Sequence, residues 1–153
     1  MRNALKKLSL VFTAGAAGGF VGGFLHWFLG AIGMLQLFDC KPAFVPFLTP
    51  QYAYAEMVWG GIWGILFVLP FLEYSIALRG ILYGLFPATV QLFIVFPLRM
   101  DDGFMGVEPY GRLAPFFVTF ISVIWGIVAS TWWWAVDFER IRPKTWHPPG
   151  PPR

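Results

Sequence analysis

The sequence predicts an all-α membrane protein, a compact bundle of four transmembrane helices with both termini in the cytoplasm. Of the 153 residues, 58% are hydrophobic and only 12% are charged. A soluble domain carries about 25% charged residues and about 45–50% apolar ones, so the apolar excess is too large for one small core. The same composition excludes a soluble enzyme, a secreted disulfide scaffold and a disordered chain.

Four apolar stretches are long enough to cross the hydrocarbon core of a bilayer, which takes about 20 residues in a helix. They are residues 8–30, 53–72, 76–98 and 115–136. The first contains no Asp, Glu, Lys or Arg, and its helix could continue to Phe38. Prolines 42, 46 and 50 separate the first two stretches, because proline cannot continue a helix. We therefore divide the chain into a helical domain, residues 1–140, and a Pro-rich basic tail, residues 141–153, which is expected to be extended or disordered.

The distribution of basic residues orients the bundle. With the N-terminus in the cytoplasm, eight Lys and Arg residues fall on the cytoplasmic side and three on the other. The eight are Arg2, Lys6, Lys7, Arg79, Arg140, Arg142, Lys144 and Arg153, and the three are Lys41, Arg99 and Arg112. This bias follows the positive-inside rule and predicts that both ends of the chain lie in the cytoplasm.

The N-terminal segment also has features of a cleavable signal peptide. Basic residues come first, and an apolar run with the small residues Ala14, Gly15 and Ala16 follows. A signal peptide has an apolar region of about 7–15 residues, whereas this stretch continues well beyond residue 16. We therefore interpret it as a retained first helix.

Small residues recur four positions apart in all four stretches, which lets helix backbones approach closely inside a bilayer. The rows are Gly15-Gly19-Gly23 and Ala14-Gly18-Gly22 in the first stretch, Gly60-Gly64 in the second, Gly80-Gly84-Ala88 in the third and Ser122-Gly126-Ser130 in the fourth. The first stretch has two small faces, so we expect it to lie centrally or to contact another protein.

The second and fourth stretches share a short motif. Ile62-Trp63-Gly64-Ile65 lies in the second stretch and Ile124-Trp125-Gly126-Ile127 in the fourth, each in the second helix of a hairpin. A parallel internal repeat about an axis along the membrane normal is one interpretation. Chance similarity between residue types that are common in membranes is the other.

Tryptophans form two groups. Trp132, Trp133 and Trp134 end the fourth stretch, where indole prefers the level of the lipid headgroups, so they are predicted to be an interfacial anchor. A surface that stacks a quinone or a pigment is the alternative. The same two interpretations apply to Trp59 and Trp63, which share one face of the second stretch.

Few polar groups lie within the predicted spans, so each is a candidate functional group. His26 continues the row of Gly18 and Gly22 by four residues and is expected to face the bundle. Its imidazole can form a hydrogen bond, relay a proton or ligate the metal of a porphyrin or chlorin. Gln91, near the middle of the third stretch, is expected to bond to another helix or to line a pathway beside a kink at Pro87.

No metal site, nucleic-acid site or catalytic site is predicted. Cys40 is the only cysteine and the chain has two histidines, which excludes a disulfide framework and a structural zinc site. The sequence has no phosphate loop, dinucleotide-binding glycine pattern or nucleophile elbow, and no aromatic–basic patch typical of nucleic-acid binders. Glu56 and Glu73 mark the two ends of the second stretch and are expected at the membrane interface.

Residues 58–70, VWGGIWGILFVLP, and residues 91–98, QLFIVFPL, resemble segments of small uncharacterised four-span inner-membrane proteins of bacteria. The resemblance implies the four-helix fold and brings no activity with it. Our main hypothesis is a non-catalytic accessory protein, a subunit, scaffold or assembly factor of a larger membrane complex. It follows from small-residue and aromatic faces in excess of what one bundle can bury.

Two alternative functions stay open. One is a small transporter or channel with His26, Gln91 and Pro87 near its pathway. The other is a binder of a planar hydrophobic cofactor, such as a quinone, a carotenoid or a chlorophyll-type pigment, against the tryptophans and His26. The expected partners are the lipid bilayer and either another membrane protein or a second copy of the chain.

Overall fold

The computed structural model describes residues 2–69, 75–100 and 102–136, and this part of the chain is helical with no strand. Its longer helices are α1 (Arg2–Ala31), α3 (Pro50–Trp63), α4 (Ile76–Val90) and α6 (Ala114–Val136). Shorter elements connect or extend them: α2 (Met34–Leu37), η1 (Pro42–Phe44), η2 (Gly64–Val68), η3 (Gln91–Arg99), η4 (Phe104–Gly106) and α5 (Val107–Tyr110). The predicted all-α class is confirmed for the described residues.

Three helical segments are long and apolar enough to cross a membrane. They are Ala4–Ala31, Ile76–Leu98 and Ala114–Val136, and they coincide with the first, third and fourth predicted stretches. The first helix ends at Ala31 and does not continue to Phe38. Gly33, which has a positive φ of 78°, turns the chain into the short helix α2, as glycine commonly does after a helix end.

The second predicted stretch is not one continuous α-helix. α3 begins at Pro50, where the Thr49 hydroxyl accepts a hydrogen bond from the Tyr52 amide at 3.1 Å, and it gives way to the 3₁₀-helix η2 at Gly64. η2 ends at Val68, and Leu69 is extended, with φ −69° and ψ 132°. The residue before a proline avoids helical backbone angles, and Pro70 follows Leu69, so the helix stops here. Residues 70–72 of the prediction lie outside the described residues.

The third stretch also changes its helix type. α4 continues directly into η3, a π-helix of nine residues that begins at Gln91. Pro87 lies inside α4, where it removes one helical hydrogen bond. π-helical segments are rare, and they frequently lie at functional sites.

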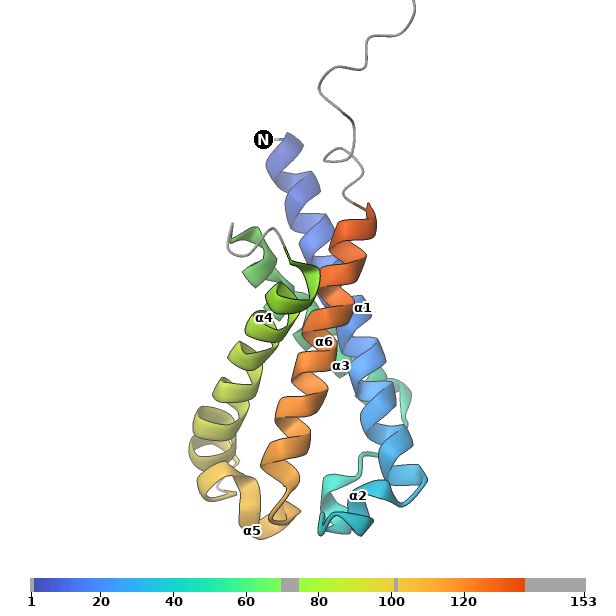
Figure 1. Cartoon of the computed structure of the whole chain (residues 1–153), viewed down its shortest axis with the longest axis vertical. Coiled ribbons are helices and arrows are strands. Elements are labelled where there is room, and N and C mark those ends of the chain that lie inside the picture. Colours follow the sequence, from blue (N-terminus) through green and yellow to red (C-terminus); the bar gives the residue numbers. More distant parts are fainter. Residues whose placement is uncertain (1, 70–74, 101, 137–153) are drawn as a thin grey trace, which may run out of the picture.

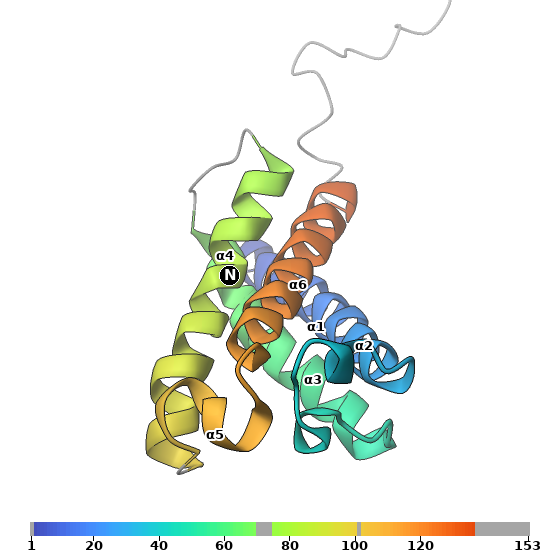
Figure 2. The same cartoon turned by 60° about the horizontal axis from the view of Figure 1, so that its bottom comes forward.

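The four long helices are arranged in the order α3, α1, α6, α4. α1 packs against α3 and η2 and also against α6, and α6 packs in turn against α4. Figure 1 shows α1 and α6 crossing at the centre, with the start of α1 and the end of α6 at the same end of the molecule. α2 and α5 lie together at the opposite end, which comes forward in Figure 2.

Small residues explain this order. A Cβ atom added to Gly60 of α3 would lie only 2.8 Å from the Cα of Gly19 in α1, and one added to Gly126 of α6 would lie 2.9 Å from the Gly84 nitrogen in α4. Only glycine permits backbones this close. Gly18, on the second small face of α1, packs against α6 in the same way.

All of the predicted small rows therefore pack within this chain. α1 lies centrally, as one of the two expectations for it required, and its two small faces are covered by α3 and α6. The rows of the third and fourth stretches meet each other between α4 and α6. Within the described residues, these small-residue rows are therefore covered by helices of the same chain.

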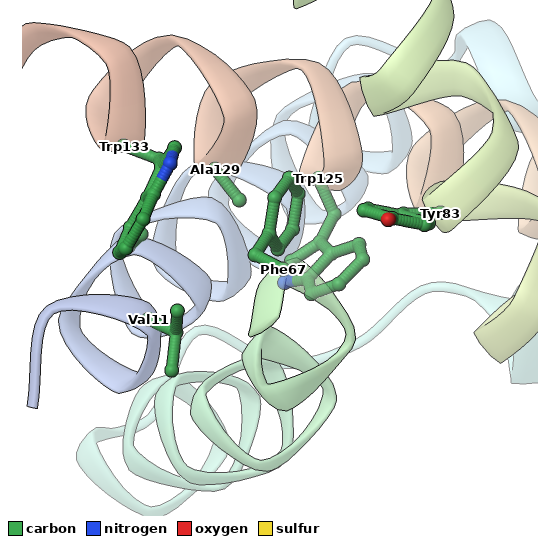
Figure 3. Packing of buried hydrophobic residues seen from close by; sticks show 7 residues of the cluster. Val11, Phe67, Tyr83, Trp125, Ala129 and Trp133 are labelled. Atoms are coloured by element: carbon green, nitrogen blue, oxygen red, sulfur yellow. The ribbon is translucent and has the colours of Figure 1, made fainter. Parts of the chain in front are cut away.

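The larger hydrophobic core joins α1, η2, α4 and α6 (Figure 3). Its buried residues are Val11, Ala14, Phe67, Tyr83, Trp125, Ala129 and Trp133. Trp133, which is 8% exposed, belongs to this core rather than to an interfacial anchor, whereas Trp132 and Trp134 are 46% and 55% exposed. Successive helical residues point in directions about 100° apart, so when Trp133 points into the core its two neighbours point to either side of it and stay exposed.

Arg79 is buried against this core although it carries a charge. Only 5% of it is exposed, and its guanidinium donates a 2.8 Å hydrogen bond to the carbonyl oxygen of Phe67 near the end of η2. The guanidinium carbon also lies 5.3 Å from the Phe67 ring centre and 5.5 Å from that of Tyr83. Arg79 thus binds the end of η2 from inside the bundle, although the sequence placed it only among the basic residues of the cytoplasmic side.

Candidate functional site

A cavity of about 730 Å³ lies between the four long helices, and residues of α1, α3, α4, η3 and α6 line it. The four residues that the sequence singled out for a ligand or a pathway all lie in its wall: His26, Trp59, Trp63 and Gln91. Its volume is within the range of about 300–1,000 Å³ that is typical of small-molecule sites. The fold therefore brings together candidates that are as many as 65 positions apart, the separation of His26 and Gln91.

Residues with little or no side chain make the room for this cavity. Gly19, Gly22 and Gly23 line it from α1, and Ser122 lines it from α6. At Gly22 an added Cβ would find its nearest neighbour, the Ile121 side chain, at an ordinary contact distance of 3.5 Å. The contact between α1 and α6 is thus looser at Gly22 than at Gly18, one turn earlier, where an added Cβ would overlap Trp125.

His26 lies where α1 meets the loop element η1. Its ring centre is 4.6 Å from that of Phe44, and the two rings are tilted by 51°. Its Nε2 atom is buried and has no hydrogen-bond partner among the described residues. A buried polar atom without a partner costs about 1–3 kcal/mol, so this nitrogen is an unsatisfied polar group beside the cavity that His26 lines.

Glu56 lies in the cavity wall, although the sequence analysis expected it at the membrane interface. Its side chain packs on Gly23 of α1, where an added Cβ would lie 2.7 Å from the Glu56 Cγ. Tyr52, one turn earlier on α3, lies within hydrogen-bonding reach of Glu56 and donates a 3.3 Å hydrogen bond to the Gly23 carbonyl oxygen. Because Gly23 has no side chain, the Glu56 side chain can pack directly against α1 at this position.

The spacing of these α3 residues is a signal that sequence reasoning missed. Tyr52, Glu56, Trp59 and Trp63 follow one another at intervals of four, three and four residues. Residues at such intervals share one face of a helix. Only the two tryptophans had been singled out as a pair, and the polar residues that continue their row had not.

Aromatic side chains form much of the remaining wall. Trp125 of α6 is buried, while Trp59 is 53% exposed, so the cavity reaches the surface of the bundle beside α3. Phe96 and Tyr110 close the end toward the loops, with ring centres 5.2 Å apart. Tyr110 donates a 2.8 Å hydrogen bond to an oxygen of Asp102, and burial together with this hydrogen bond and the carboxylate charge raises the pKa of Tyr110.

The arrangement suits the binding of an amphipathic molecule. Indole and phenyl rings offer apolar and stacking surface, and Glu56, Gln91 and His26 are among the residues with ionisable or amide groups that line the cavity from the helices. Such a combination is typical of ligand pockets, where apolar walls provide affinity and a few polar groups fix orientation. Trp132, Trp133 and Trp134 are not among the residues that line the cavity.

The two copies of the Ile-Trp-Gly-Ile motif take equivalent places in their hairpins. Gly64 packs against α1 and Gly126 against α4, in each case the first helix of the hairpin. Trp63 and Trp125 both line the cavity. This equivalence agrees with an internal repeat, which stays a prediction.

Comparison of the chain with known protein families, with curated proteins and with solved structures gave no match. The resemblance to four-span bacterial inner-membrane proteins therefore stays a prediction.

Proposed function

We propose that this chain is a small membrane transporter or carrier that binds an amphipathic small molecule in the cavity between α1, α3, α4 and α6. The main support for this proposal is the set of residues that line the cavity. The cavity joins the residues that the transporter hypothesis requires, His26, Gln91 and Pro87, with the aromatic surface of Trp59 and Trp63. Polar residues among membrane-spanning helices are costly and commonly mark the path of a substrate.

Two further features favour a mobile ligand over a merely structural void. The cavity reaches the bundle surface at the half-exposed Trp59, which offers a route from the lipid phase. Its α4 side contains Pro87 and the change to a π-helix at Gln91. Interrupted helices line the binding sites of many transporters, because they place backbone groups and bends at the substrate.

The proposal includes a topology of four spans in a bacterial inner membrane with both ends in the cytoplasm. α3 and η2 together run from residue 50 to residue 68 and have a combined length of about 30 Å, close to the thickness of the hydrocarbon core. The excess of Lys and Arg at the two ends of the chain supports the orientation, even without the buried Arg79.

A planar hydrophobic cofactor is the second candidate ligand. The observation that favours it is the unpartnered Nε2 atom of His26, which lines the same cavity as Trp59 and Trp63. Imidazole there suits hydrogen bonding to a quinone carbonyl or ligation of a chlorin metal. The visible and ultraviolet spectrum of protein purified without denaturants separates the two candidates, since a bound pigment or quinone would appear in it.

The accessory role stays a hypothesis. Of the two observations behind it, the small-residue faces and the aromatic faces, the first no longer favours it. The small-residue faces that suggested a partner are occupied by helices of the same chain. A membrane-protein partner or a second copy would therefore have to bind to the outward aromatic and aliphatic side chains. Native mass measurement after mild solubilisation tests this, and a stable monomer without a copurifying protein would count against it.

Binding in the cavity is tested with three aromatic probes of similar shape and different charge: tetraphenylphosphonium, the neutral triphenylphosphine oxide, and tetraphenylborate. Equilibrium dialysis against protein in nanodiscs, corrected with empty nanodiscs, measures saturable binding. We expect Ser122→Phe, which fills the cavity, to abolish saturable binding of any probe that binds. Thr131→Phe, on an exposed face of the same helix, should leave it unchanged. If no probe shows binding that depends on Ser122, the proposal fails.

A further inference from the structure

The charge of the cavity wall points to the class of ligand. Glu56 is the only carboxylic acid among the described residues that line it, and no Lys or Arg is among them. Within the described part of the chain, Tyr52 is the side chain that lies within hydrogen-bonding reach of Glu56, and no basic residue pairs with it. An acidic side chain that lies between the helices of a bundle ordinarily has a positive partner, because an unpaired charge is costly away from water.

The aromatic rings around Glu56 suit the same class of ligand. Trp59 and Trp63 follow Glu56 on one face of α3, and Trp125 lines the cavity from α6. A cation over an indole face is attracted by the negative face of the ring, and tryptophan is the strongest of the aromatic residues in this respect. A bare metal ion fits less well, since calcium and magnesium take six or more oxygen ligands.

We propose that the cavity binds a lipophilic organic cation, such as an alkylated or arylated ammonium or phosphonium. The Glu56 carboxylate faces its charge, and the indole rings of Trp59 and Trp63 pack against its apolar groups. This inference rests on the proposed function and names the substrate class of the same site. His26 and Gln91, which line the same cavity, then contribute polar contacts that do not distinguish a cationic ligand from a neutral one.

The charge series of the three probes tests the inference. We expect wild-type protein in nanodiscs to bind tetraphenylphosphonium at least about tenfold more tightly than triphenylphosphine oxide, and tetraphenylborate not measurably. Glu56→Gln keeps the shape of the side chain and removes its charge, so it should weaken tetraphenylphosphonium binding about tenfold or more while the neutral probe binds as before. Trp63→Ala should weaken tetraphenylphosphonium binding by about threefold to tenfold, the range of a partly desolvated cation–π contact.

Glu108→Gln is the matched control, because Glu108 is an exposed carboxylate of α5 that is not among the residues lining the cavity. It should leave the binding of all three probes unchanged. Unchanged binding of the neutral probe to Glu56→Gln also shows that this variant is folded.

The outcomes separate the two proposals. If a probe binds in a manner that depends on Ser122, but the neutral or anionic probe binds as tightly as the cation, the organic-cation inference is wrong and the proposed function stands. The same holds if Glu56→Gln and Glu108→Gln weaken cation binding equally. If none of the three probes binds in the cavity, both proposals fall.

Discussion

The indole of Trp125 joins α6 to α1 by donating a 2.9 Å hydrogen bond from its Nε1 atom to the carbonyl oxygen of Gly15. The same ring lies against Gly18, where an added Cβ would be 2.9 Å from its Cδ1 atom. Trp125 also lines the cavity. One side chain therefore fixes the contact between the two central helices and one wall of the candidate site.

Replacing this tryptophan tests the role of the hydrogen bond. Trp125→Phe keeps an aromatic ring but removes the donor, so we expect the free energy of unfolding to fall by about 1–2 kcal/mol. Thermal unfolding in mild detergent, followed by circular dichroism, measures the change. Trp134→Phe is the control, since Trp134 is 55% exposed at the end of the same helix. Equal melting temperatures for the two variants would contradict the assigned role.

Arg79 is expected to stabilise the end of η2. Its guanidinium holds the Phe67 carbonyl oxygen at 2.8 Å and lies near that of Leu69 at 3.4 Å. Arg79→Met fills similar space but leaves the Phe67 carbonyl without this donor, whereas the Leu69 carbonyl keeps the 2.9 Å hydrogen bond from the Tyr83 hydroxyl. We expect a loss of about 2–3 kcal/mol in the free energy of unfolding. Arg79→Lys should lose part of this, because an ammonium group lacks the planar fork that stacks on Phe67.

The Arg79 variants are measured by thermal unfolding beside Arg112→Met, which removes an exposed arginine from the opposite end of the bundle. A melting temperature of Arg79→Met equal to that of Arg112→Met would mean that the buried guanidinium contributes nothing net. A lower melting temperature for Arg79→Lys than for Arg79→Met would also contradict a stabilising role of the hydrogen bond.

Cys40 provides a test of the loop end of the structure. Cys40 is 4% exposed, and its backbone pairs with that of Gly111 in an isolated antiparallel β-bridge. Burial, and to a smaller extent the Asp39 carboxylate, raise the pKa of the Cys40 thiol. Because a thiol reacts as the thiolate, the raised pKa keeps Cys40 mostly unreactive near pH 7, and its reaction should quicken only at a more alkaline pH than that of an exposed cysteine.

The measurement is the rate of maleimide labelling of folded protein. We expect Cys40 to react at least about tenfold more slowly than a cysteine placed at Leu37 in a Cys40→Ser background, because Leu37 is 80% exposed on neighbouring α2. Denaturation in detergent should make the two rates equal. Similar rates in the folded protein would contradict the burial of the Cys40 thiol.

Sequence reasoning found the helices because hydropathy alone decides which segments can cross a bilayer. The first, third and fourth stretches agree with the structure to within a few residues at most ends, and the glycine rows indicated which faces meet. The stop at Gly33 was also accessible, since glycine after an apolar helix is a common end signal. The predicted end at residue 30 agrees with the observed end at Ala31, and the continuation to Phe38 was left open because hydrophobic residues extend to that position.

The remaining features depend on contacts between distant segments. Arg79 turns inward only because η2 ends beside it with carbonyl groups that need a donor. Glu56 lines the cavity only because Gly23 of another helix gives it room. Periodicity placed Trp59 and Trp63 on one face of their helix, but it could not show that His26 and Gln91 lie in the wall of the same cavity.

Gly18 and Gly22 belong to one row of α1 and look alike in the sequence, but their surroundings differ. At Gly18 an added Cβ would overlap the Trp125 backbone and lie 2.9 Å from its ring, whereas at Gly22 the nearest atom, in Ile121, would be 3.5 Å away. Gly18→Ala must therefore move α6 away from α1 or displace Trp125. Gly22→Ala adds a methyl group beside the cavity without a clash.

We expect Gly18→Ala to lower the free energy of unfolding by about 1–3 kcal/mol, the usual cost of overpacking. Gly22→Ala should be neutral or slightly stabilising, since alanine favours the helix by up to about 1 kcal/mol relative to glycine. Thermal unfolding of the two variants in the same detergent measures the difference. Equal destabilisation would mean that α1 and α6 are as close at Gly22 as at Gly18, and the space beside Gly22 that opens into the cavity would then not exist.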